Sequence, residues 1–106
     1  MRFGLPESAV DGIVAVLSRH PKIEKAVIFG SRAKGTHGKG SDIDLAVSGR
    51  AFDLAEEARL LDDLDELLLP YTIDMVNYSR IENPALIDHI DRVGMLLYAR
   101  SPADLD

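Results

Sequence analysis

The sequence predicts an α/β domain in which helices flank a small β-sheet. The chain has 106 residues, of which 46% are hydrophobic and 28% charged, a balance typical of one compact domain. Segments with the periodicity of amphipathic helices alternate with short runs of β-branched and aromatic residues. A glycine-rich segment, residues 30–41, separates the first two of these runs. We therefore expect one domain over residues 1–100 and a loose, acidic tail over residues 101–106.

The first helix and the first strand precede the glycine-rich segment. Between Pro6 and Pro21, apolar residues follow the i, i+3, i+4, i+7 rule, which predicts an amphipathic helix. The apolar run at residues 26–29 stops at Gly30 and predicts a buried strand. Residues 30–41 contain four glycines and no aliphatic side chain larger than alanine. This segment is therefore predicted to be a loop with room for one helical turn.

A second strand and a second helix follow this loop. Residues 43–47 predict a strand whose large aliphatic side chains share one face, while Asp42 and Asp44 share the other. Asp53 and Glu56 resemble a capping box at the start of a helix that runs to Pro70. The stripe predicted to face the core of this helix is Leu54, Ala58, Leu61, Leu64 and Leu68.

The remaining segment predicts a strand, a helix and a last strand. Residues 71–76 are rich in β-forming residues, and Asp74 is the only charged residue among them. An Asn-Pro pair, a good cap and first turn, begins a helix over residues 83–94, which ends at a glycine. Residues 95–99 predict a fourth strand at an edge of the sheet.

Charge and composition exclude several classes of function. Acidic residues number 18 against 12 basic ones, and the net charge of −6 disfavours direct binding to nucleic acid or to an anionic membrane. The chain has no cysteine, so it has neither disulfides nor thiolate metal sites. No run of eighteen uncharged apolar residues occurs that could span a membrane. We expect a soluble, cytoplasmic protein.

Three aspartates occupy strand positions where an ordinary strand would not place them. Asp42 and Asp44 point to the same side of the sheet, and Asp74 lies beside them if its strand is the neighbour. At about 5 Å and an effective dielectric near 20, each pair of carboxylates repels by roughly 3 kcal/mol. A divalent cation removes this repulsion, and Mg²⁺ binds through one or two carboxylates together with substrate phosphates. The three aspartates therefore predict a metal site that binds a nucleotide.

The glycine-rich loop supports this interpretation. Taken singly, each aspartate has an ordinary structural explanation as a cap, a solvent-exposed residue or a partner of an arginine. Gly30 and Ser31, however, directly follow a strand, where a bare backbone can approach a phosphate and a hydroxyl can donate to it. Arg32 adjoins this pair and is the best placed of the loop's basic residues to contact a phosphate. Gly30, Ser31 and Arg32 are the predicted nucleotide-binding residues.

These residues carry a resemblance to a known family. Gly30-Ser31, ten further residues, then Asp42-Ile43-Asp44 and a later strand aspartate resemble the signature of the DNA polymerase beta-like nucleotidyltransferase superfamily. The short chain and the text FGSRAKG…SDIDLAV are most similar to the minimal nucleotidyltransferases, or MNT proteins. The resemblance implies a palm-like mixed sheet backed by helices. It also implies two Mg²⁺ ions, or Mn²⁺ in their place, held by Asp42, Asp44 and Asp74 as catalytic residues.

The resemblance further implies a partner. MNT proteins are the antitoxins of HEPN-domain RNases, so the expected reaction transfers AMP from ATP to a hydroxyl, such as a tyrosine, of a HEPN protein in a hetero-oligomer. Two alternatives remain open: a transferase for a small hydroxylated compound such as an aminoglycoside, and a nucleotide-binding or steric partner subunit without turnover. The sequence does not specify which base the triphosphate carries or which molecule is the acceptor. It assigns no role to the three histidines, with His37 expected at the surface, or to the tyrosines.

Overall fold

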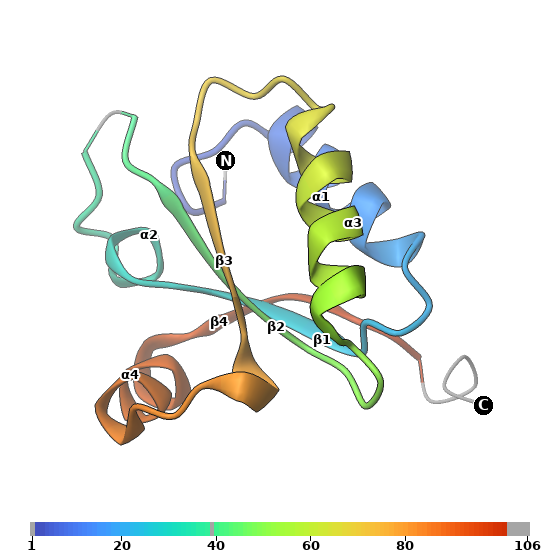
Figure 1. Ribbon diagram of the computed structural model, residues 1–106. Helices are drawn as coiled ribbons and strands as arrows, with labels where there is room; N and C mark the ends of the chain where they lie inside the picture. The colour runs from blue at the N-terminus through green and yellow to red at the C-terminus, as the bar shows by residue number, and fades with distance from the viewer. Residues whose placement is uncertain (1, 39, 102–106) are drawn as a thin grey trace.

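A four-stranded β-sheet forms the centre of the protein, and helices pack on both of its faces (Figure 1). The structure is a computed structural model that describes residues 2–38 and 40–101. Its elements in chain order are α1 (Glu7–Ser18), β1 (Lys25–Phe29), α2 (Ser31–Lys34), β2 (Ile43–Ser48), α3 (Leu54–Asp65), β3 (Ile73–Asn77), the 3₁₀ turn η1 (Tyr78–Arg80), α4 (Pro84–Val93) and β4 (Met95–Ala99).

The strands lie in the order β3-β2-β1-β4 and form a mixed sheet. β1 pairs antiparallel with both β2 and β4, whereas β2 and β3 are parallel. Parallel neighbours cannot be joined by a tight turn, and α3 provides the crossover between β2 and β3. The predicted mixed sheet and the predicted edge position of the last strand are therefore confirmed.

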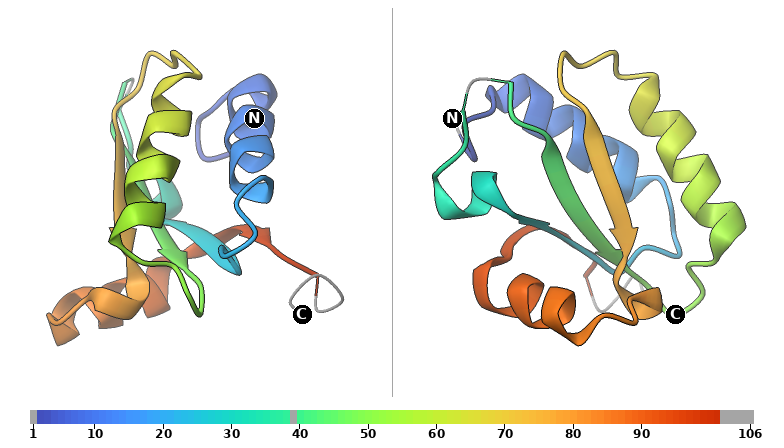
Figure 2. Two further views of the ribbon diagram at one scale, coloured as in Figure 1. Left: turned by 45° about the vertical axis from the view of Figure 1, so that its right-hand side comes forward. Right: turned by 60° about the vertical axis from the view of Figure 1, so that its left-hand side comes forward.

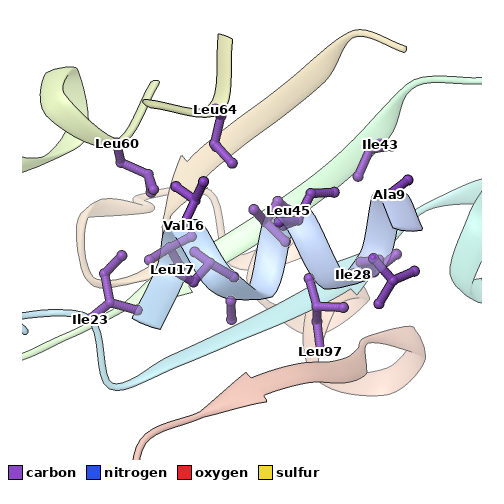
Figure 3. Close-up of a cluster of buried hydrophobic side chains, with 14 of the residues drawn as sticks. Ala9, Val16, Leu17, Ile23, Ile28, Ile43, Leu45, Leu60, Leu64 and Leu97 are labelled. Atoms are coloured by element: carbon purple, nitrogen blue, oxygen red, sulfur yellow. The ribbon is translucent and has the colours of Figure 1, made fainter. Parts of the chain in front are cut away.

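The main core lies between one face of the sheet and the helices α1 and α3 (Figure 2). Figure 3 shows aliphatic side chains of both helices directed toward those of β1, β2 and β4. In β2, the alternate residues Ile43, Leu45 and Val47 are all completely buried on this face. This confirms the predicted alternation of the strand: its large aliphatic side chains share one face, and their burial there stabilises the fold.

α4 packs on the opposite face of the sheet. Its Ile90 joins Phe29 and Ala46 in a second, smaller apolar cluster, to which Val76 and Tyr78 also belong. Phe29 ends β1, Ala46 and Val76 lie within β2 and β3, and Tyr78 begins η1. Figure 2 shows α4 across one end of this face, so the beginnings of β2 and β3 are left without a helix above them.

The predicted helix starts are confirmed at the level of single hydrogen bonds. The Asp53 carboxylate accepts a hydrogen bond from the Glu56 amide at 3.0 Å, which lowers the pKa of Asp53. The Asn83 side chain accepts from the Ala85 amide at 2.9 Å at the start of α4. The glycine-rich segment contains one short helical turn, α2, as the sequence allowed.

The core stripe predicted for α3 is confirmed only at Leu64 and is wrong at its other positions. Leu60 and Leu64 are buried, whereas Leu54, Leu61 and Leu68 are 63%, 41% and 87% exposed. The helix carries leucines on two adjacent stripes, and periodicity does not say which stripe faces the sheet. α3 also ends at Asp65, before Leu68, which adopts a left-handed backbone with φ of 52° in the following turn.

Residues 102–106 of the predicted tail lie outside the described residues. Among the described residues, no helix has both the length and the apolar character required to cross a bilayer.

Gly49 is a position where the fold requires the absence of a side chain. It follows β2, and a methyl group on its α-carbon would overlap the carbonyl oxygen of Lys22. We expect Gly49→Ala to destabilise the protein by roughly 1–3 kcal/mol, as overpacking does, and to lower the melting temperature by roughly 4 °C or more. Gly38→Ala is the matched control, because a methyl group there meets only ordinary contacts. Equal melting temperatures for the two variants in thermal unfolding would contradict the predicted contact.

Candidate active site

Asp44 and Asp74 lie directly opposite each other on the parallel strands β2 and β3. Their Cα positions are register partners, so their side chains leave the same face of the sheet. Because Ile43 and Leu45 fill the face covered by α1 and α3, this is the face that carries α4. Asp42 precedes the strand by one residue and is exposed, as Asp74 is. The structure thus brings Asp44 and Asp74 together at the end of the face that α4 leaves uncovered.

Gly30 and Ser31 follow β1 at the same edge of this face. Phe29, the last residue of β1, is the register partner of Asp44. Gly30 has a left-handed φ of 72°, and a methyl group there would overlap a carboxylate oxygen of Asp44. Ser31 begins α2, and its hydroxyl makes no hydrogen bond within the described ranges. The backbone turn at Gly30 therefore lies immediately beside Asp44, and Ser31 follows it directly in the chain.

The acidic residues repel one another. The pKa of Asp44 is raised above its ordinary value of 3.8, first because the carboxyl is partly buried and then because of the negative charges of Asp74 and Asp42. The nearby imidazole of His89 acts in the opposite direction and lowers the pKa of Asp44. A half-buried carboxylate beside two like charges is a site that a cation would stabilise.

The donor set fits a divalent metal such as Mg²⁺. Carboxylate oxygens are hard ligands, and Asp42, Asp44 and Asp74 offer them without any competing thiolate or imidazole cluster in the described part of the chain. The side chains are not closed into a cage: within residues 2–38 and 40–101, no three His, Cys, Asp or Glu side chains are gathered closely enough to hold an ion alone. Such an open set suits an ion that takes its remaining ligands from substrate phosphates.

Arg32 does not lie where a phosphate ligand was expected. Its side chain is only 3% exposed and points into the protein, where the guanidinium donates to the backbone carbonyls of Ser41 and Phe3. A guanidinium occupied in this way has no free edge for a phosphate. Arg32 was selected because it follows Ser31 in the sequence, but adjacency along the chain does not determine the direction in which a side chain points.

His89 is near the site, and the sequence argument did not select it. The residue lies on α4, where its ring meets Phe29 edge-on with ring centroids 6.0 Å apart. Its imidazole also lowers the pKa of Asp44, as described above. His89 lies three residues after Leu86 and one before Ile90, on the apolar side of an Asn-capped helix. This helical spacing is the signal that could have placed it toward the sheet.

The other two histidines have structural contacts. His37 was expected at the surface, but it is half-buried and packs so closely on Gly4 that no side chain fits at that glycine. Its Nδ1 is buried and has no hydrogen-bond partner among the described residues. His20 is buried, with its Nε2 2.8 Å from a carboxylate oxygen of Asp63, and so links the end of α1 to α3.

Comparison with known protein families identifies the class. Residues 11–103 match the family model described as Polymerase beta, Nucleotidyltransferase. The chain therefore belongs to this nucleotidyltransferase family, and the resemblance inferred from the sequence is confirmed. A comparison with curated protein sequences finds no match.

Solved structures place the fold among minimal nucleotidyltransferases. The chain is 26% identical to one in a toxin–antitoxin complex with AMP-PNP, covering 90% of this chain and 77% of that one with a TM-score of 0.70. It is also 26% identical to a candidate minimal nucleotidyltransferase, over 90% and 95% of the two chains, with a TM-score of 0.69. At 22% identity, it shares the fold of a chain in the complex of tri-AMPylated Shewanella oneidensis HEPN toxin with MNT antitoxin, with a TM-score of 0.66 over 92% and 76% of the chains.

The repulsion at Asp44 predicts a stability effect that depends on pH. In the presence of a chelator at neutral pH, we expect Asp44→Asn to raise the melting temperature, because it removes a carboxylate that burial and like charges disfavour. A raised folded-state pKa favours the protonated folded protein, so the stability linked to Asp44 is complete below its ordinary pKa and is lost as pH rises through the raised value. The advantage of the variant should therefore shrink on acidification from pH 7 toward pH 4.

Thermal unfolding across this pH range tests the effect. Asp11→Asn is the control, because Asp11 is exposed on α1, away from the three aspartates. A gain of equal size in both variants, or one that does not vary with pH, would show that the carboxylates do not interact as described.

Proposed function

We propose that this protein is a metal-dependent nucleotidyltransferase of the MNT type, which transfers AMP from ATP to a hydroxyl of a HEPN-domain RNase and thereby inactivates it. The observation that carries the proposal is the pairing of Asp44 with Asp74 on the open face of the sheet, against Gly30. Family membership supports nucleotidyl transfer. The structurally similar complexes, one with AMP-PNP and one of an AMPylated HEPN toxin with its MNT antitoxin, support the nucleotide and the partner.

Asp42, Asp44 and Asp74 hold the divalent cations in this proposal. When bound, Mg²⁺ or Mn²⁺ supplies positive charge for the triphosphate and acidifies the attacking hydroxyl. Asp44 is central, because it is the register partner of Asp74 and two residues from Asp42, and so lies beside both other carboxylates. The open arrangement of the three side chains leaves coordination positions for phosphate oxygens.

Gly30 and Ser31 bind the phosphates. The left-handed turn at Gly30 keeps side-chain atoms away from the Asp44 carboxylate, so the triphosphate can approach the backbone there. The hydroxyl of Ser31, which has no partner among the described residues, donates to a phosphate oxygen in this proposal. These contacts hold the α-phosphate beside the carboxylates while the acceptor approaches from solvent.

The transfer step is a displacement at the α-phosphorus. The acceptor oxygen forms a bond to this phosphorus as the bond to the bridging oxygen of the β-phosphate breaks, and pyrophosphate leaves with that electron pair. Asp74, which is exposed at the start of β3, takes the proton of the acceptor hydroxyl. The products are the adenylylated acceptor and pyrophosphate.

The open face favours a protein as the acceptor. α4 covers only the far end of the face, and the described chain has no second lobe to enclose a small substrate (Figure 2). Enzymes that modify small molecules generally bury them in a concave pocket. A docked partner protein would supply both the hydroxyl and the missing wall of the site.

Nucleotide binding should depend on the metal. We expect calorimetry to show ATP binding in Mg²⁺ or Mn²⁺ and almost none in a chelator, because three carboxylates repel an uncompensated triphosphate. Asp42→Asn should weaken the metal-dependent binding while the protein stays folded. ATP affinity that is unchanged by chelator would rule out a site built on these carboxylates.

Transfer to a partner should be covalent. Incubation with the HEPN protein, ATP and Mg²⁺ should add the mass of AMP to the partner, read by intact-mass spectrometry, and the RNase should stay inactive after this protein is removed. The Asp44→Asn protein is the control, because it retains the docking surface but loses a metal ligand.

A different result would identify the alternative function. If the partner gains no mass and Asp44→Asn neutralises the RNase as well as the parent protein does, then binding alone carries the function. The chain would then be a steric or nucleotide-binding subunit without turnover.

A further inference from the structure

Arg32 is a buried cation whose hydrogen bonds all go to the backbone. Its Nε and Nη2 donate to the carbonyl of Ser41 at 3.0 and 2.7 Å, and its Nη1 donates to the carbonyl of Phe3 at 2.8 Å. The guanidinium lies over the ring of Tyr71, with its carbon 5.0 Å from the ring centroid. Among the described residues, no carboxylate pairs with it.

These contacts join the segments that carry the site. Arg32 itself follows Ser31, the proposed phosphate ligand, and Ser41 directly precedes Asp42. Tyr71 lies just before β3, and the carbonyl of its neighbour Thr72 accepts from the amide of Ile43 at 2.8 Å. Arg32 therefore lies next to Ser31 in the chain, binds the backbone just before Asp42 and contacts an aromatic ring just before the strand that carries Asp74.

The chemistry of this contact is specific to arginine. A planar guanidinium presents several donors in a rigid fork, so it can bind one carbonyl through two nitrogens, a second carbonyl through a third, and an aromatic ring with its face. A lysine carries the same charge but has one nitrogen and no plane. The residue can therefore hold the far end of a glycine-rich loop whose largest aliphatic side chain is that of Ala33.

We propose that Arg32 is a positioning residue, which holds the backbone at Ser41 so that Asp42 lies on the same face as Asp44 and Asp74. This rests on the proposed function, in which the three aspartates bind the metal. It differs from a phosphate-binding role because the guanidinium acts on the metal ligand from inside the protein. Loss of Arg32 should therefore impair metal binding even when no nucleotide is present.

The chain contains a matched control in Arg100. Its guanidinium also donates to three backbone carbonyls, those of Ile23, Ser18 and His20, at 3.0, 3.2 and 2.9 Å. It also lies over a tyrosine ring, that of Tyr98, at 5.8 Å. Arg100 follows β4 and joins it to the segment before β1, at the opposite end of β1 from Gly30. Removal of Arg100 should therefore cost stability without affecting the aspartates.

Metal titration separates positioning from general stability. We would measure Mn²⁺ binding without nucleotide by electron paramagnetic resonance, at a temperature well below the melting transition, for the parent, Arg32→Ala, Arg32→Lys and Arg100→Ala. We expect Arg32→Ala and Arg100→Ala both to lower the melting temperature. Only the Arg32 variants should weaken Mn²⁺ binding, by roughly tenfold or more, as the loss of a group that orients a metal ligand does. Added methylguanidinium should restore part of the affinity of Arg32→Ala.

Each outcome decides the proposal. If the parent protein binds Mn²⁺ and both Arg32 variants bind it equally well, the positioning role is excluded and the proposed function stands. If the Arg32 variants lose only affinity for AMP-PNP in the presence of Mn²⁺, Arg32 is a phosphate ligand instead. If the parent binds Mn²⁺ only when AMP-PNP is present, this inference fails and the proposed metal site stands; if it binds none in either case, both fail. Should Arg32→Ala not fold, Arg32→Lys retains the charge and provides the same comparison.

Discussion

The alternation of side chains along β2 is the constraint on which the site depends. Ile43, Leu45 and Val47 are completely buried against α1 and α3, and full burial of such side chains stabilises a protein by about 1.5–3 kcal/mol each. Since successive residues of a strand point to opposite faces, this burial directs Asp44 to the other face. The repulsion between two half-exposed carboxylates is at most about 3 kcal/mol, so the apolar side of the strand determines the arrangement.

The parallel pairing of β2 with β3 adds the second carboxylate. The register places Asp74 directly opposite Asp44. α3 makes this parallel pairing possible, because it returns the chain to the end of the sheet at which β2 begins. The apolar cluster of Phe29, Ala46 and Ile90 then fixes α4 on the same face, beside the acidic residues. The face is thus divided into a packed end, which supports the sheet, and an open end, which carries charge.

The glycine-rich loop is held largely by contacts of its backbone and polar side chains, because Ala33 is its only aliphatic side chain. Gly30 allows the backbone to lie against Asp44, Arg32 binds the backbone at Ser41 and His37 packs on Gly4. Glycine allows the backbone to approach other groups closely, but it loses more conformational entropy on folding than other residues do. Contacts of this kind offset that entropic cost. The loop therefore combines access for a ligand with a defined path between β1 and β2.

The sequence by itself determined the elements and the family, and predicted the acidic site, because all of these depend on local patterns. Strand alternation placed Asp42 and Asp44 on one face, the Asp53 and Asn83 caps marked helix starts, and the spacing from Gly30-Ser31 to Asp42-Ile43-Asp44 identified the family. Only the tertiary structure decided which leucines of α3 face the sheet, the parallel register of Asp44 with Asp74, the inward direction of Arg32 and the place of His89. These features are set by packing between segments far apart along the chain, whose relative positions no periodicity within a single segment specifies.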